Sequence, residues 1–187
     1  MKSKIETLVL FYALLLALSY LPDVAVVALP SLASPVPITT ITIREDGRVD
    51  VEPGPAAPLV RKGRLYSFLG DIPARIVVES DDVIIDGRGY RLYKPEGVEG
   101  DYVGIEINGR VNVTIRNVTI YGFQTGVYAK RSIGVVVENC TVVGSTLRGL
   151  HFYGSSNVRV EGSTLRNNSL EGLRFSYTKG GNVTRNE

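Results

Sequence analysis

A short motif of one glycine followed by alternating apolar residues recurs at near-constant spacing through the second half of the chain. Its four copies lie 22, 23 and 23 positions apart and read Gly104-Ile105-Glu106-Ile107, Gly126-Val127-Tyr128-Ala129, Gly149-Leu150-His151-Phe152 and Gly172-Leu173-Arg174-Phe175. The alternation indicates strands with one buried face. A period this short cannot contain a pair of helices, but it fits one coil of a β-solenoid.

A second apolar column accompanies the first and predicts further strands in every coil. It reads Val83-x-Ile85-x-Gly87, Val113-x-Ile115-x-Asn117, Val135-x-Val137-x-Asn139 and Val158-x-Val160-x-Gly162. Because every coil advances in the same direction, the sheets should be parallel, with equivalent residues stacked about 4.8 Å apart. Asparagine tolerates the left-handed conformation of a sharp bend, so we expect Asn117 and Asn139 to lie in bends, where their amides would hydrogen-bond from coil to coil.

These columns resemble the right-handed parallel β-helix superfamily over residues 70–187. Asp82-Val83-Ile84-Ile85-Asp86-Gly87-x-Gly89 is similar to a first full coil of such proteins, and residues 112–117 are similar to an internal coil. More narrowly, they resemble the NosD-type and carbohydrate-associated β-helix proteins of prokaryotic cell envelopes. The resemblance implies an all-β, single-stranded right-handed parallel β-helix of four to five coils. It implies no single activity, because the superfamily includes lyases, hydrolases, tailspikes and inert spacers.

The pattern divides the chain into three parts. Residues 1–34 read as a signal peptide and short linker, residues 35–75 as an N-terminal β cap, and residues 76–187 as the β-helix. In the cap, residues 38–51 read as strand, turn and strand, whereas we interpret the basic cluster at 61–64 as a solvated loop. The last coil stops soon after Asn182, so we expect a truncated solenoid whose open coil favours self-association.

The N-terminus has the pattern of a targeting segment. A basic start, Met1-Lys2-Ser3-Lys4, precedes an apolar run from Leu8 to Leu18, and small-residue cleavage positions follow. The run is short for a membrane span of about 20 residues, so a cleaved signal is favoured over an uncleaved anchor. We therefore expect a protein that is secreted, periplasmic or attached to the cell surface, and that contacts a membrane only through this segment.

Composition argues against several classes of function. A net charge of +2 argues against nucleic-acid binding as the main role. With one histidine and one cysteine, the chain lacks the ligand clusters that copper requires, and we expect no metal and no cofactor. Cys140 cannot form an internal disulfide, and its repeat equivalent is Val118, so we interpret it as a small buried filler.

The outward positions of the glycine-led strands form the candidate site. One outward residue per coil gives Glu106, Tyr128, His151 and Arg174, with Lys130 and Tyr153 beside them. Sugar rings can pack on aromatic side chains, and charged side chains can hydrogen-bond to sugar hydroxyls. The insertion at 93–102 contributes Asp101, since loops on rigid scaffolds often carry binding function. The alternative is that an outward column of a solenoid is simply polar.

Catalysis finds less support than binding. Glu106 and Glu171 lie three coils apart, about 14 Å at strand spacing, which is too far for a paired acid and base. We assign Asp86 to a turn and name no catalytic residue. The leading hypothesis is a non-catalytic module that binds carbohydrate or another cell-envelope partner. A fragment of a polysaccharide-active lyase or hydrolase and a structural spacer of a larger surface protein remain as alternatives.

Five Asn-x-Ser/Thr sequons could carry glycans in a secreted protein. They begin at Asn112, Asn117, Asn139, Asn167 and Asn182. We expect the side-chain amides of Asn117 and Asn139 to be held inside the bends, which makes these two residues poorer candidates for glycosylation. Asn167 and Asn182, which we expect in turns, are the better candidates for glycosylation.

Overall fold

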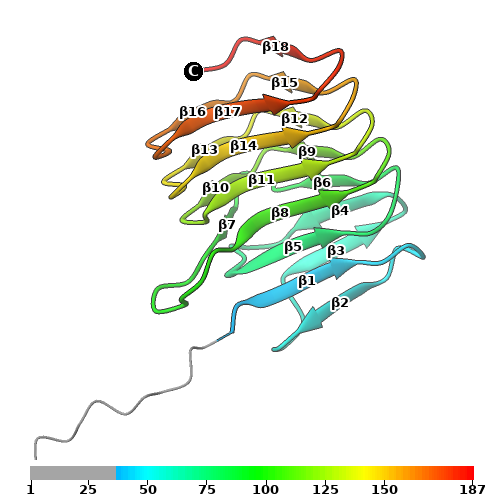
Figure 1. Cartoon of the computed structure of the whole chain (residues 1–187). Coiled ribbons are helices and arrows are strands. Elements are labelled where there is room, and N and C mark those ends of the chain that lie inside the picture. The colour runs from blue at the N-terminus through cyan, green and yellow to red at the C-terminus, as the bar shows by residue number, and fades with distance from the viewer. Residues whose placement is uncertain (1–36) are drawn as a thin grey trace, which may run out of the picture. The chain divides into compact units, whose positions relative to one another are not determined.

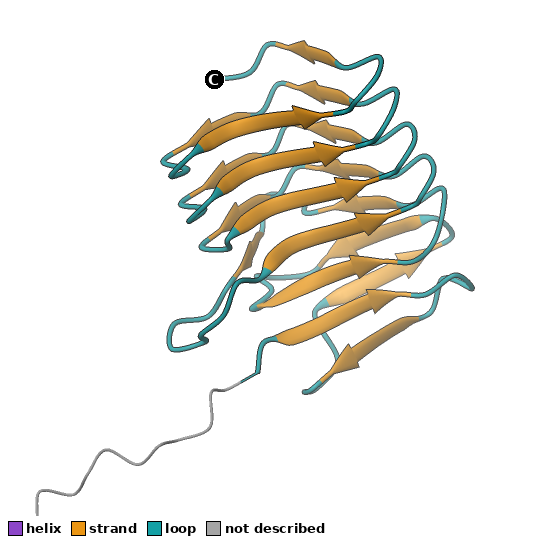
Figure 2. Ribbon diagram, in the orientation of Figure 1, coloured by secondary structure: helices purple, strands orange, loops and turns teal. Residues whose placement is uncertain are grey.

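A computed structural model describes residues 37–187, which form a stack of short strands joined by tight bends (Figures 1 and 2). No helix occurs in this part of the chain, and therefore none that could cross a membrane. The predicted signal peptide and linker at 1–34 lie outside the described residues.

Three sheets form the stack, two of seven strands and one of four strands that begins at β7. The first sheet has the order β17-β14-β11-β8-β5-β1-β2, the second β18-β15-β12-β9-β6-β4-β3, and the third β16-β13-β10-β7. The strands of the first sheet are β1 Thr39–Ile43, β2 Val49–Glu52, β5 Ala74–Val78, β8 Val103–Asn108, β11 Thr125–Lys130, β14 Arg148–Tyr153 and β17 Glu171–Ser176. Those of the second sheet are β3 Leu59–Lys62, β4 Leu65–Phe68, β6 Ile84–Asp86, β9 Thr114–Arg116, β12 Val136–Glu138, β15 Arg159–Glu161 and β18 Asn182–Thr184. Those of the third sheet are β7 Arg91–Tyr93, β10 Thr119–Tyr121, β13 Thr141–Val143 and β16 Thr164–Arg166.

The strand register confirms the predicted parallel β-helix. Tyr128 of β11 pairs with Glu106 of β8 and with His151 of β14, and His151 pairs with Arg174 of β17. All pairings are parallel except the hairpins β1–β2 and β3–β4. The repeat therefore places equivalent residues of successive coils beside one another, as the spacing predicts.

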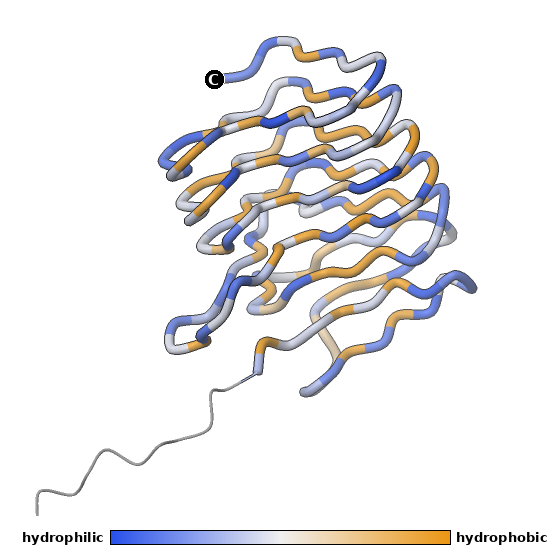
Figure 3. Tube along the Cα trace, in the orientation of Figure 1, coloured by the Kyte–Doolittle hydropathy of each residue, from blue (hydrophilic) through white to orange (hydrophobic). Residues whose placement is uncertain are grey.

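The interior is a continuous apolar column, because each strand turns alternate residues inward. Ile105, Val127 and Leu150 are fully buried, and the alternation of apolar and polar positions is visible along each coil (Figure 3). Cys140 is 2% exposed, and burial raises the pKa of its thiol to about 12. Its place in the core, equivalent to Val118, confirms that it is a buried filler.

The asparagine bends are partly as predicted. Asn117 and Asn139 both adopt φ of 51°, the left-handed conformation. The Asn117 amide, however, donates to Asp86, and the exposed Asn139 side chain makes no side-chain hydrogen bond in the described region. The expected hydrogen bond between coils is therefore present for Asn117, with a carboxylate of the preceding coil as its acceptor, and the expectation is wrong for Asn139. Next to Asn139 in the following coil lies Gly162, where an added Cβ would approach the Asn139 Oδ1 to 2.7 Å.

The N-terminal end is closed by two hairpins. The predicted strand-turn-strand at 38–51 is β1 and β2. The interpretation of residues 61–64 as a solvated loop is right in part: all four residues are exposed and Gly63 and Arg64 form the turn, but Arg61 and Lys62 belong to β3, which pairs with β4. Parallel stacking already begins here, since β1 pairs with β5 and β4 with β6. The boundary that we expected at residue 75 falls inside β5.

Candidate functional site

The outer face of the first sheet holds four aromatic side chains in a row, which we call the aromatic run. The rings of Tyr128 and His151 have centroids 5.1 Å apart, those of His151 and Tyr153 are 6.4 Å apart, and those of Tyr153 and Tyr177 are 5.5 Å apart. Three of the residues lie on β11 and β14, and Tyr177 follows the end of β17. Because parallel hydrogen bonds fix these strands, the run is held at a defined spacing.

Two neighbouring groups of the run, Tyr128 and His151, are partly withdrawn from water. The pKa of His151 lies below its usual value because of burial and the nearby cations Arg148 and Arg174, so the ring is neutral at neutral pH. Its Nε2 lies 3.3 Å from the Ser176 hydroxyl. Burial, Tyr153 and Glu106 raise the pKa of Tyr128. The run therefore presents uncharged, partly apolar rings.

An ion-pair cluster borders the run on one side. Arg148 Nε donates to Glu171 at 2.5 Å, and Arg174 donates to the other oxygen of Glu171 at 2.8 Å. The hydrogen bond from Arg148 is the main reason that the pKa of Glu171 is lowered. Glu171 is thus an ionised structural partner of two arginines and lacks the features of a general acid.

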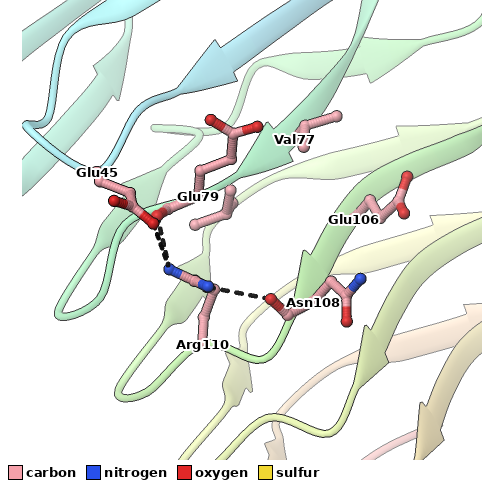
Figure 4. A pocket seen from close by; sticks show the side chains of 7 residues that line it. Glu45, Val77, Glu79, Glu106, Asn108 and Arg110 are labelled. Carbon is pink, nitrogen blue, oxygen red and sulfur yellow. Dashed lines mark hydrogen bonds and ion pairs between the residues drawn. The ribbon is translucent and has the colours of Figure 1, made fainter.

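A separate cavity lies at the N-terminal end of the same face. It measures about 400 Å³ and is lined by Glu45, Val77, Val78, Glu79, Glu106, Asn108 and Arg110 (Figure 4). We call it the acidic cavity. Glu79 and Glu106 face it from adjacent strands, because Val77 pairs with Glu106 and Glu79 follows two residues later.

The carboxylates of the acidic cavity are already held by arginines. Glu106 accepts from Arg75, and Glu79 accepts from Arg44 at 3.1 Å. Glu45 lies 3.6 Å from Arg110, which also donates to the Asn108 carbonyl oxygen (Figure 4). Arg75 Nε is buried without a hydrogen-bond partner in the described region. The cavity is therefore lined by ion pairs, and some of its carboxylate oxygens have no hydrogen-bond donor in the described region.

The candidate residues from the sequence fall into two places. Tyr128, His151 and Tyr153 meet in the aromatic run, with Lys130 and Arg174 on its edges. Glu106 faces the acidic cavity instead. Asp101 lies on the exposed loop before β8 and makes no hydrogen bond or ion pair with any of these residues in the described region.

The two glycosylation candidates are both exposed. Asn167 lies in the bend between β16 and β17 with φ of 54°. Asn182 is the first residue of β18, so its placement in a turn is wrong.

Sequence reasoning missed Tyr177 and most of the acidic cavity. Tyr177 occupies the bend position held by Gly109 and Gly154 in other coils, and a tyrosine among glycines is the signal that could have found it. Glu79 was missed because the long loop after β7 sets Val77 and Glu106 29 positions apart, outside the 22–23-residue period. Among residues 37–187, no three His, Cys, Asp or Glu side chains converge to hold a metal ion.

Comparison with known proteins identifies the fold. Residues 98–187 match the family model described as the right-handed beta helix region. The match is to the repeat itself and is not specific to NosD-type proteins. No curated protein and no solved structure matches the chain.

Proposed function

Because the protein is a right-handed parallel β-helix, we propose that it is a non-catalytic module that binds a glycan along the outer face of its first sheet. The observation that carries this proposal is the aromatic run, with successive ring centroids 5.1, 6.4 and 5.5 Å apart. Sugar rings pack on aromatic faces through their apolar C–H surfaces, while their hydroxyls hydrogen-bond at the ring edges.

The surroundings of the run favour a polar chain molecule over a protein partner. Ser176, Lys130 and Arg174 provide hydroxyl, ammonium and guanidinium groups beside the rings. Because the rings run diagonally from β11 across β14 to the end of β17, an extended chain could contact several at once. We further propose that the module works outside the cytoplasm, in the periplasm or at the cell surface, on the evidence of the basic and apolar residues at the N-terminus.

A glycan array with the purified protein tests the proposal. We expect retention of at least one glycan class, and a loss of about tenfold in affinity with Tyr128→Ala or Tyr153→Ala, since alanine removes the apolar ring surface on which a sugar would pack. Tyr121→Ala is the matched control, because Tyr121 is 53% exposed on the third sheet, away from the run. Equal losses in all three variants, or no binding at all, would contradict the proposal and favour a structural spacer.

A polysaccharide-active enzyme is the second candidate, because Glu79 and Glu106 face one cavity. Inverting and retaining glycosidases both use two carboxyl groups that flank the scissile bond, and two carboxylates in one cavity could supply such a pair. Against catalysis, each carboxylate is bound by an arginine that would have to be displaced. Release of reducing ends from bound glycans, abolished by Glu106→Gln, would establish the enzyme.

A further inference from the structure

Two cations beside the aromatic run have no acidic partner. Lys130 pairs in register with Tyr153, and Arg131 follows it in the bend. Within residues 37–187 neither side chain lies within 4.0 Å of a carboxylate, whereas Arg148 and Arg174 share Glu171. The run is therefore bordered by positive charge that the protein itself does not neutralise.

Arg131 occupies a backbone position that normally favours glycine. It adopts φ of 51° in a bend where successive coils carry Gly109, Arg131, Gly154 and Tyr177. Long side chains rarely adopt this conformation, and such positions often mark functional sites. The Arg131 side chain lies beside Gly154 of the next coil, since a Cβ at Gly154 would lie 3.7 Å from Arg131 Cγ, an ordinary contact distance. Arg131 and Tyr177 thus flank one glycine, with Tyr153 contacting the Tyr177 ring.

The electrostatic environment of the run agrees with this arrangement. Besides burial, the nearby charges of Arg148 and Arg174 hold the pKa of His151 down, and Glu171 offsets them only in part. The opposite end of the face carries the carboxylates of the acidic cavity. A ligand that extends over the aromatic run therefore lies beside the cations Lys130 and Arg131, which are unpaired in the described region, whereas the carboxylates beyond Tyr128 are already paired with arginines.

We propose that the ligand is an acidic glycan, a chain bearing carboxylate or sulfate groups, whose rings lie on the aromatic run and whose anionic groups pair with Lys130 and Arg131. This inference rests on the proposed glycan binding and specifies its chemical class. Successive coils are about 4.8 Å apart, so Lys130 and the ring of Tyr153 in the next coil can contact one sugar and its acidic substituent together. A guanidinium such as that of Arg131 can bind a carboxylate or sulfate by two hydrogen bonds.

Matched pairs of glycans isolate the contribution of charge. The probes are uronic-acid oligosaccharides against their methyl esters, and sulfated oligosaccharides against the same chains after desulfation, bound to the whole protein at low and high salt. We expect the acidic member of at least one pair to bind about tenfold more tightly at low salt, with an advantage that shrinks as salt rises. Equal or tighter binding of the neutral members would overturn this inference and leave glycan binding intact. Failure of every probe would overturn both.

Two variants and one competitor test the assigned residues. Lys130→Gln should weaken the binding of the acidic probes about threefold and leave the binding of the neutral probes unchanged. Lys62→Gln, on β3 at the other end of the molecule, should leave the binding of both kinds of probe unchanged. Arg131→Gly should also weaken the acidic probes without lowering Tm, because other coils have glycine at this bend. A lowered Tm with unchanged binding would make Arg131 structural and overturn its role. Tighter binding of single-stranded DNA than of any glycan, with the same response to both variants, would replace the glycan with a nucleic acid.

Discussion

At Gly126 the backbone of one coil approaches the next so closely that no side chain fits. A Cβ there would lie 2.4 Å from Val142 Cγ1 and 2.7 Å from the Gly149 carbonyl oxygen. We expect Gly126→Ala to lower the free energy of unfolding by about 2 kcal/mol, the usual cost of overpacking. Gly70→Ala is the control, because the nearest atom to its Cβ would be 3.9 Å away. Urea denaturation measures both, and equal midpoints would contradict the steric argument.

The buried thiol of Cys140 gives a second prediction at the scale of single residues. Burial keeps it protonated, with a pKa of about 12, so a thiol reagent at pH 8 should modify it only after unfolding. Because the folded pKa lies above the unfolded value of about 8.5, the stability that this group contributes is complete below that value. It is lost as pH rises toward 12. Cys140→Val should remove this alkaline loss, and an unchanged pH profile would contradict the assignment.

Asp86 connects two strands of the second sheet and shows how one side chain fixes an element. It accepts from the Arg88 amide, from Asn117 and from Arg116, which joins β6 to β9. Burial opposes ionisation of Asp86, but these hydrogen bonds outweigh it, and the net effect is a lowered pKa. The expected placement of Asp86 in a turn is wrong, because Asp86 is the last residue of β6, although its carboxylate accepts the Arg88 amide of the turn that follows.

Removal of this carboxylate should destabilise the protein in a pH-dependent way. We expect Asp86→Ala to lower the free energy of unfolding by about 2–3 kcal/mol at pH 7. Because the folded pKa is depressed, the contribution is present above the unfolded value of about 3.9 and is lost as pH falls through the folded pKa. The difference between wild type and variant should therefore shrink in acid. Asp101→Ala, on the exposed loop, should leave the midpoint unchanged at both pH values.

The sequence predicts an element well where its residues alternate inside the repeat. Glu106, Tyr128 and His151 have the expected register because the spacing of their coils is constant. Strand β3 escaped prediction because it is an edge strand with mostly exposed side chains, and its pattern of burial does not alternate. Charged residues such as Arg61 suit an exposed edge as well as a loop, so composition could not separate the two.

For the whole molecule, the constant spacing of the coils predicts which residues share a face better than it predicts the charges around them. Constant spacing predicts that Tyr128, His151 and Tyr153 share one face, and the structure shows their rings in contact. The acidic cavity depends on Glu79, which the long loop after β7 separates in sequence from Glu106, and on Glu45, which lies in the turn between β1 and β2. Neither follows a period, so only the folded chain shows that the face has an aromatic and an acidic end.

The last described coil leaves part of the apolar column uncovered. Leu170, Phe175 and Val183 are 63%, 37% and 46% exposed, whereas Phe152, equivalent to Phe175 one coil earlier, is fully buried. β17 and β18 are the final strands of their sheets, so each also has an edge free to pair within the described region. Apolar surface next to an unpaired strand edge favours association with another chain.

The exposed apolar side chains of this coil should therefore favour self-association in solution. Sedimentation velocity should show a mass that rises with protein concentration, and Leu170→Asp together with Val183→Asp should return it to the monomer, since buried charge opposes the contact. Leu69→Asp is the control, because Leu69 is 56% exposed but lies in the cap. A monomer at all concentrations would contradict the prediction, and an equal effect of the control would move the contact to the N-terminal end. Because the aromatic run lies on the outer face of the sheet, glycan binding should persist in the monomeric variant.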